Sequence, residues 1–108
     1  MNLFDLIPKI SKHITTENEG ELLVIVFPRF RSKFMQKYFV PKNKSATIRV
    51  RLEKHGTAVL NLIDGKRTVH EIAEALAEHF NNEKNYEYRI AAYIKQLQQQ
   101  DFVELLRS

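Results

Sequence analysis

The stretch LEKHGTAVLNLIDGKRTVHEIAEAL at residues 52–76 decides the fold, because its pattern predicts a helix, a sharp turn and a second helix. In its first half, Leu60 and Ile63 recur at the spacing of a helix that is buried on one face. Gly65 predicts the end of that helix, since glycine adopts the left-handed conformation of helix ends at little steric cost. We therefore expect the first helix over about 53–63, with a turn directly after it.

The second half of the stretch has the pattern of a helix start. Thr68 and Glu71 have the spacing of a capping box, in which each side chain accepts a hydrogen bond from the backbone N–H of the other residue. An apolar stripe then predicts a second helix over about 69–80, and two helices joined so tightly cross at a steep angle. The stripe consists of Val69, Ile72, Ala73, Leu76, Ala77 and Phe80.

Patterns of period two predict strands ahead of these helices. Residues 46–52 alternate between aliphatic and polar side chains, as in a strand with one buried face. Two further strands are predicted at 13–16 and 21–27, around a turn at 17–20. Both alternating sets in 21–27 are mostly apolar, so the pattern leaves open which set faces the core.

The fold class is therefore α+β and winged-helix-like, with a three-stranded antiparallel sheet followed by three helices. The third helix is expected at 86–100, and Phe102 or Val103 in the extended tail after it is expected to close the core. At 108 residues the chain is one domain. Its parts are an N-terminal arm at 1–12, a sheet region at 13–52 with a basic loop at 29–45, and a three-helix unit with its tail at 53–108.

Composition favours a cytoplasmic globular protein. Hydrophobic residues make up 44% of the chain, and no apolar run approaches the length that spans a membrane. The first residues lack the charged region and cleavage site of a secretory signal. The absence of cysteine excludes disulfides and thiolate metal sites.

Positive charge is concentrated in one part of the sequence. Residues 29–54 hold nine basic side chains and a single acid, Glu53, within a chain of net charge +4. Such a concentration indicates an acidic partner or nucleic acid, and the alternative is a solvated loop. Phe30, Phe34 and Tyr38 in the loop could stack on bases, but aromatics four residues apart are more often part of a core.

Nothing in the sequence has the pattern of a catalytic site. His70-Glu71 begins a likeness to the zinc-peptidase motif H-E-x-x-H, but position 74 is glutamate and Glu71 serves the capping box. The three glycines are never close together, so no phosphate-binding loop is present. We therefore expect no enzyme activity, no metal and no cofactor.

A family resemblance is carried by Gly56, Val59-Leu60, Leu62-Ile63-Asp64-Gly65 and Arg67-Thr68-Val69 with Glu71-Ile72. Together with Ile90, Tyr93-Ile94, Leu97 and Asp101-Phe102-Val103, these residues resemble the signature of the coenzyme PQQ synthesis protein D (PqqD) family. The resemblance covers residues 46–106. It implies the fold known as the RiPP recognition element and a non-catalytic role: such proteins bind the leader of a ribosomally made precursor peptide and present it to a modifying enzyme, typically a radical-SAM protein.

The resemblance also implies a place for the leader, as a strand added to the sheet edge beside the third helix. Arg49 and Arg51 would favour an acidic leader, although they could equally guard an exposed edge against aggregation. An exposed edge also invites strand exchange between copies, so a homodimer is a further expectation. The expected peptide-binding residues are Thr47, Arg49, Arg51, Arg89, Tyr93, Gln96 and Gln100.

The alternative function is that of a winged-helix nucleic-acid-binding or regulatory protein. Such a domain inserts a helix into the major groove and contacts phosphates with lysine and arginine. Residues 68–100 instead carry five glutamates against three basic side chains, so this helix pair would be repelled by phosphate. Nucleic acid is therefore not the expected partner of these helices, and DNA contact through the basic loop and the strand at 46–52 is left as a minor alternative. No membrane partner is expected.

Overall fold

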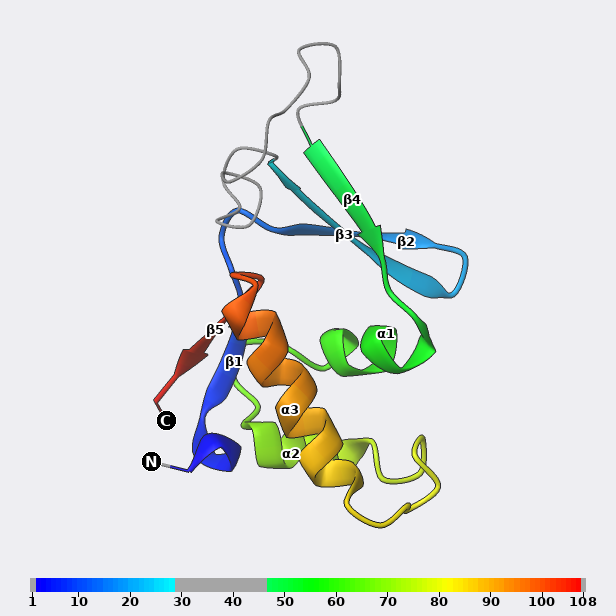
Figure 1. Cartoon of the computed structure of the whole chain (residues 1–108), viewed down its shortest axis with the longest axis vertical. Coiled ribbons are helices and arrows are strands. Elements are labelled where there is room, and N and C mark those ends of the chain that lie inside the picture. The colour runs from blue at the N-terminus through cyan, green and yellow to red at the C-terminus, as the bar shows by residue number, and fades with distance from the viewer. Residues whose placement is uncertain (1, 29–46, 108) are drawn as a thin grey trace.

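The computed structural model describes residues 2–28 and 47–107, which form an α+β fold with three helices (Figure 1). The predicted α+β class, with a three-stranded antiparallel sheet and three helices after it, is confirmed. The predicted basic loop at 29–45, with its aromatic pattern, lies outside the described residues. The elements in chain order are η1 (Leu3–Asp5), β1 (Ile7–Ile10), β2 (Thr15–Glu19), β3 (Leu22–Pro28), β4 (Thr47–Arg51), α1 (Lys54–Asn61), α2 (Val69–Ala75), α3 (Tyr86–Gln99) and β5 (Val103–Leu106).

The three predicted strands form an antiparallel sheet in the order β2-β3-β4. The central strand β3 pairs Ile25 with Thr16 on one side and with Val50 on the other. Among residues 2–28 and 47–107, β4 has a neighbouring strand on one side only. Within the described residues β2 and β4 are thus the two edge strands, and the side of β4 that faces away from β3 is called its open edge below.

The hairpin turn lies later than predicted. We expected a strand at 13–16 and a turn at 17–20, whereas β2 continues to Glu19 and only two residues separate it from β3. Gly20 has φ +65 and occupies the first position of this tight turn, where glycine is favoured. All of β2 is exposed, so its polar sequence resembled a turn although it forms a strand.

The main core lies between β3 and the helices. Leu23, Ile25 and Phe27 belong to it, which decides between the two alternating sets of this strand. Val24 is also buried, with 1% of its surface exposed, although it points to the other face of the sheet. From the helices the core takes Val59, Leu60, Val69, Ile72, Ile90, Ile94 and Leu97, among others.

The N-terminal segment is not a separate arm, because residues 7–10 form β1 and pair with β5 in a second antiparallel sheet. Ile7 lies opposite Leu106 and Ile10 opposite Val103. Val103 is 2% exposed, which confirms that the tail closes the core. The pairing joins segments near opposite ends of the sequence, and a local pattern cannot reveal such a pairing.

The second helix is shorter than its apolar stripe. We predicted it over 69–80, but α2 ends at Ala75 and the chain continues in irregular turns through Asn82, which has a positive φ of 52°. Phe80 is nevertheless 6% exposed, because these turns keep it on the core side. The apolar spacing of residues 69–80 therefore does not distinguish a long helix from a short helix followed by tight turns. Among the described residues, no helix is long and apolar enough to cross a membrane.

The turn between α1 and α2 has the predicted geometry. Gly65 has φ +77, the left-handed conformation that we expected there. The Thr68 hydroxyl accepts from Glu71 N at 3.1 Å, and Glu71 Oε1 accepts from Thr68 N at 2.9 Å, which completes the capping box. Asp64 Oδ1 accepts from the backbone N–H groups of Lys66 and Arg67, each at 2.9 Å. Asp64 therefore stabilises the turn through these two hydrogen bonds, and Gly65 supplies the left-handed conformation that the turn requires.

Candidate functional site

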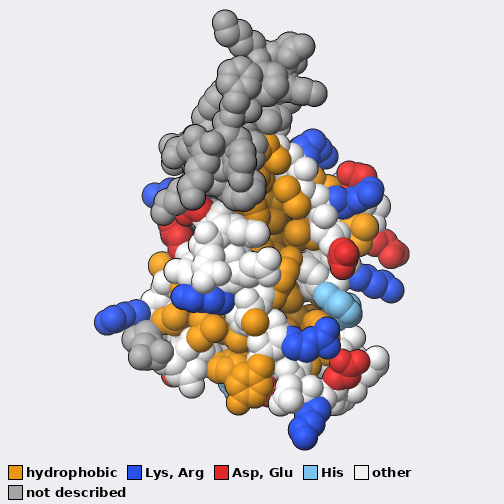
Figure 2. All heavy atoms as spheres, in the orientation of Figure 1, with side chains coloured by type: hydrophobic (Ala, Val, Ile, Leu, Met, Phe, Trp, Pro, Cys, Tyr) orange, Lys and Arg blue, Asp and Glu red, His pale blue; other side chains and the backbone are white. Residues whose placement is uncertain are grey.

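A pocket of about 390 Å³ lies where the end of β4, the start of α1 and the middle of α3 meet. Figure 2 shows apolar side chains gathered in a stripe on this face, between the β2–β4 sheet and α3. The floor of the pocket is apolar and consists of Leu52, Val59, Phe80 and Ile90. The end of β4 therefore lies beside an apolar hollow.

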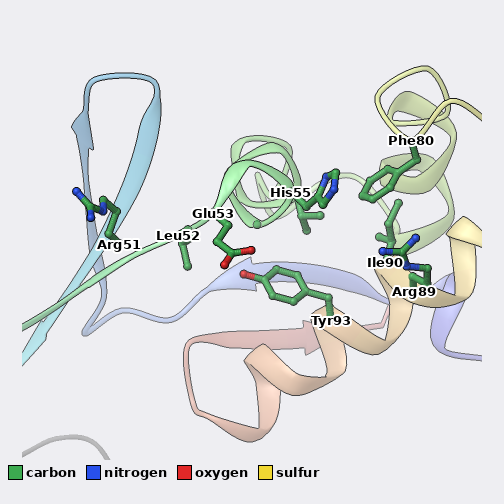
Figure 3. A pocket seen from close by; sticks show the side chains of 10 residues that line it. Arg51, Leu52, Glu53, His55, Phe80, Arg89, Ile90 and Tyr93 are labelled. Atoms are coloured by element: carbon green, nitrogen blue, oxygen red, sulfur yellow. The ribbon is translucent and has the colours of Figure 1, made fainter.

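Gly56 and Tyr93 set the width of the pocket. A β-carbon at position 56 would lie 2.5 Å from the Tyr93 hydroxyl oxygen, so only glycine lets this phenol approach α1. Burial, and secondarily the Glu53 carboxylate, raises the pKa of Tyr93 above its ordinary value. The hydroxyl therefore stays protonated near neutral pH, and it points toward Glu53 in Figure 3.

Two histidine side chains contact each other at the pocket. His55 Nδ1 and His79 Nε2 are 2.9 Å apart, so one ring donates a hydrogen bond to the other and the accepting nitrogen must be unprotonated. The His55 ring also stacks on Phe80, with ring centroids 4.7 Å apart. These contacts connect α1 to the turns after α2, and they hold Phe80 in the pocket wall.

The basic side chains at the rim are already paired. Arg51 Nη1 lies 3.0 Å from Glu19 of β2, and Arg89 Nη1 lies 2.9 Å from Glu83. The Arg89 guanidinium also lies 5.9 Å from the centre of the Phe80 ring. By contrast, the Glu53 side chain has no hydrogen bond or ion pair within the part of the chain that the structure describes.

The outer face of the sheet is covered by ion pairs that span β3. Arg49 pairs with Glu17 at 2.5 Å, in the same way that Arg51 pairs with Glu19. On this face Val24 is 1% exposed and lies opposite Glu17 on β2 and Arg51 on β4, one member of each pair. The two arginines therefore serve the fold, and their charges are balanced within the sheet.

The structure brings together three of the seven expected binding residues. Arg51, Arg89 and Tyr93 line the pocket. Thr47 and Arg49 lie earlier on β4, and both are exposed. Gln96 and Gln100 are exposed toward the C-terminal end of α3 and do not line the pocket.

Sequence reasoning missed Glu53, His55 and Phe80 as pocket residues. Phe80 belonged to the apolar stripe of the second helix, and nothing in its spacing separates a pocket wall from a core position. Gly56 was the available signal, because a glycine inside a helix is costly unless a close approach requires it.

The likeness to a metal-binding motif has a structural explanation. His70 Nε2 lies 2.8 Å from Glu74, one helical turn away, and both side chains are exposed. No group of three or more histidine, aspartate or glutamate side chains in the described segments is placed to hold a metal ion.

Fold and pocket together define a small α+β domain with an apolar groove beside an open sheet edge. The chain belongs to the coenzyme PQQ synthesis protein D (PqqD) family, whose sequence model matches residues 46–103. This match spans β4 and all three helices, so it contains every residue that lines the pocket. Membership supports an accessory role in biosynthesis of the PQQ or RiPP type. Comparisons with curated proteins and with solved structures find no match.

Proposed function

We propose that this protein binds the leader segment of a ribosomally made precursor peptide and presents it to the enzyme that modifies it, a radical-SAM protein. The leader adds as a strand to the open edge of β4, beside α3. One observation carries the proposal: this edge leads into the apolar pocket between α1 and α3. Strand addition supplies affinity through backbone hydrogen bonds, and the pocket supplies selectivity.

The backbone of β4 is oriented for this role. Leu52 N donates to the Leu23 carbonyl at 2.9 Å, so the backbone groups of Leu52 face β3. In an antiparallel ladder, successive residues face alternate sides. The N–H and C=O groups of Arg49 and Arg51 therefore face the open edge, where an incoming strand can pair with them.

The side chains of α3 line the second wall of the binding track. Tyr93 and Arg89 contact the residue that enters the pocket. Gln96 and Gln100 extend the polar face of α3, and they can hydrogen-bond side chains or backbone of the leader. Thr47 begins the strand on which the peptide is added. In this role the protein positions a substrate and carries out no chemical step itself.

Proline at position 49 tests the backbone part of the proposal. Arg49→Pro removes an N–H that faces the open edge, and proline is tolerated at such positions of edge strands. Arg49→Ala is the matched control, because it loses the same ion pair with Glu17 and keeps the N–H. The probes are short peptides selected from a random displayed library on the wild-type protein, with binding sites mapped by amide chemical shifts.

We expect the selected peptides to shift amides of 47–52 and 86–100. Arg49→Ala should retain most of the affinity, whereas Arg49→Pro should lose about tenfold, since at least one backbone hydrogen bond and its geometry are lost. Equal affinity of the two variants would contradict strand addition at β4. Shifts confined to other elements, or equal shifts with duplex DNA of any sequence, would reject the peptide function itself.

A further inference from the structure

The pocket combines an apolar floor with one carboxylate that is available for binding. Leu52, Val59 and Ile90 supply aliphatic surface, and Phe80 and Tyr93 supply ring surface. Glu53 lies at the rim, at the N-cap of α1, and makes no side-chain cap bond there. In Figure 3 its carboxylate faces into the pocket beside the Tyr93 hydroxyl.

The other charges at the rim nearly cancel. Arg51 lies 3.0 Å from the Glu19 carboxylate, and Arg89 lies 2.9 Å from the Glu83 carboxylate. A close ion pair acts as a dipole, and its field falls off faster than that of a single charge, the more so in salt. Among the described Asp, Glu, Lys and Arg side chains that line the pocket, Glu53 is therefore the one without a close ionic partner.

We propose that the pocket takes a lysine or arginine side chain of the bound peptide, with Glu53 as the residue that selects it. This inference rests on the proposed function. Lysine and arginine have an apolar stem and a charged head, which match an apolar floor with an acidic rim. The cation ends beside the Glu53 carboxylate and the ring of Tyr93, where an aromatic face adds attraction.

This selectivity is opposite to the one that the sequence indicated. From the sequence, Arg49 and Arg51 would favour an acidic leader. In the structure, Glu17 and Glu19 balance these two charges. An acidic leader would have to displace these carboxylates from exposed pairs, with little net gain. A basic residue meets an acid that has no partner among the described residues.

The test uses library-selected peptides that bind at β4 and α3. Selection on the wild-type protein should enrich lysine or arginine at one position, and selection on Glu53→Gln should lose that enrichment. For one selected peptide, replacing the basic residue by norleucine removes the charge and keeps most of the stem. We expect this change to weaken binding to wild type about fivefold and to leave binding to Glu53→Gln nearly unchanged.

Glu104→Gln serves as the matched control, because Glu104 is an exposed acid on β5 that does not line the pocket. It should behave as wild type does, which shows that the effect is not one of net charge. If peptides bind at β4 and α3 without a basic preference, or if Glu53→Gln keeps the preference, the inference is wrong and the proposed function stands. If no peptide binds at this edge, the proposed function fails and the inference fails with it.

Discussion

The hydroxyl oxygen of Tyr93 occupies the space in which residue 56 would carry its β-carbon. A Cβ on Gly56 would meet this oxygen at 2.5 Å and the ring carbon Cζ at 3.2 Å. Glycine within a helix costs about 1 kcal/mol relative to alanine. Alanine would avoid this cost, but its β-carbon would clash with the Tyr93 hydroxyl that α3 places against α1 at the pocket.

Replacing Gly56 by alanine should separate stability from binding. The gain in helix propensity, about 1 kcal/mol, offsets the displacement of Tyr93, so the free energy of unfolding changes little. The displaced ring changes the pocket, and selected peptides should bind about tenfold more weakly, since the contact with Tyr93 is lost. Titration of both proteins by amide chemical shifts measures the difference. Adding Tyr93→Phe removes the closest atom, so a double variant that recovers no affinity would contradict this account.

Replacing Thr68 by alanine should destabilise the fold by about 1 kcal/mol, because an N-cap acceptor is lost. Thr68→Ser keeps the hydroxyl and should cost much less. Denaturant unfolding of the two variants measures both values. A loss in Thr68→Ser as large as that in Thr68→Ala would assign the effect to the threonine methyl group.

The turn between α1 and α2 should make stability depend on acid pH. Backbone N–H groups of Arg67 and Lys66 hold the pKa of Asp64 below its ordinary value, and the Thr68 N–H does the same for Glu71. Carboxylates with lowered pKa stabilise the fold above their unfolded pKa, and this contribution is lost as the pH falls through the folded pKa. Unfolding free energy should therefore decline below about pH 4.5. The Asp64→Asn, Glu71→Gln double variant should decline less, and an equal decline would place the titrating groups elsewhere.

Gly65 should tolerate asparagine far better than valine. Its φ of +77 is strained for residues with a β-carbon, and asparagine is the exception that adopts this conformation most readily. We expect Gly65→Val to cost about 2 kcal/mol and Gly65→Asn clearly less. Thermal unfolding compares the variants, and equal melting temperatures would mean that the turn relaxes without strain.

Exchanging the charges of Arg49 and Glu17 should restore what either single reversal loses. Arg49→Glu places two carboxylates close together across β3 and should cost up to about 1 kcal/mol. The double variant with Glu17→Arg restores the pair and should recover most of this loss. If stability is recovered but peptide affinity is not, then the Arg49 side chain also contacts the peptide. A double variant as unstable as Arg49→Glu would show that the pair does not stabilise the sheet.

Local signals explain why the turn could be predicted in detail. Gly65 and the capping pair of Thr68 and Glu71 act over only three or four residues. A short segment of sequence therefore includes all the partners of each interaction. The three helices and the strand at 46–52 followed from period, whereas the first two strands also needed the turn residues between them.

The pocket could be predicted only in part, because its walls come from distant segments. Arg89 and Tyr93 were found through the polar face of a helix, but Glu53 and His55 had no distinguishing pattern. The ion pairs of Arg49 and Arg51 could not be predicted, since their partners lie across a strand whose register the sequence leaves undetermined.

The pairing of β1 with β5 has a consequence for the order of folding. Ile7 pairs with Leu106, so this sheet can close only after residues 103–106 have been synthesised and have left the ribosome. Contacts so distant along the chain are formed late, because a long loop must be closed first. The β2–β4 sheet and α1 lie closer together in the sequence and do not need this closure. Just before β1, the Leu6 carbonyl accepts a hydrogen bond from Val69 N at the start of α2. The described fold is therefore complete only once β5 has paired with β1.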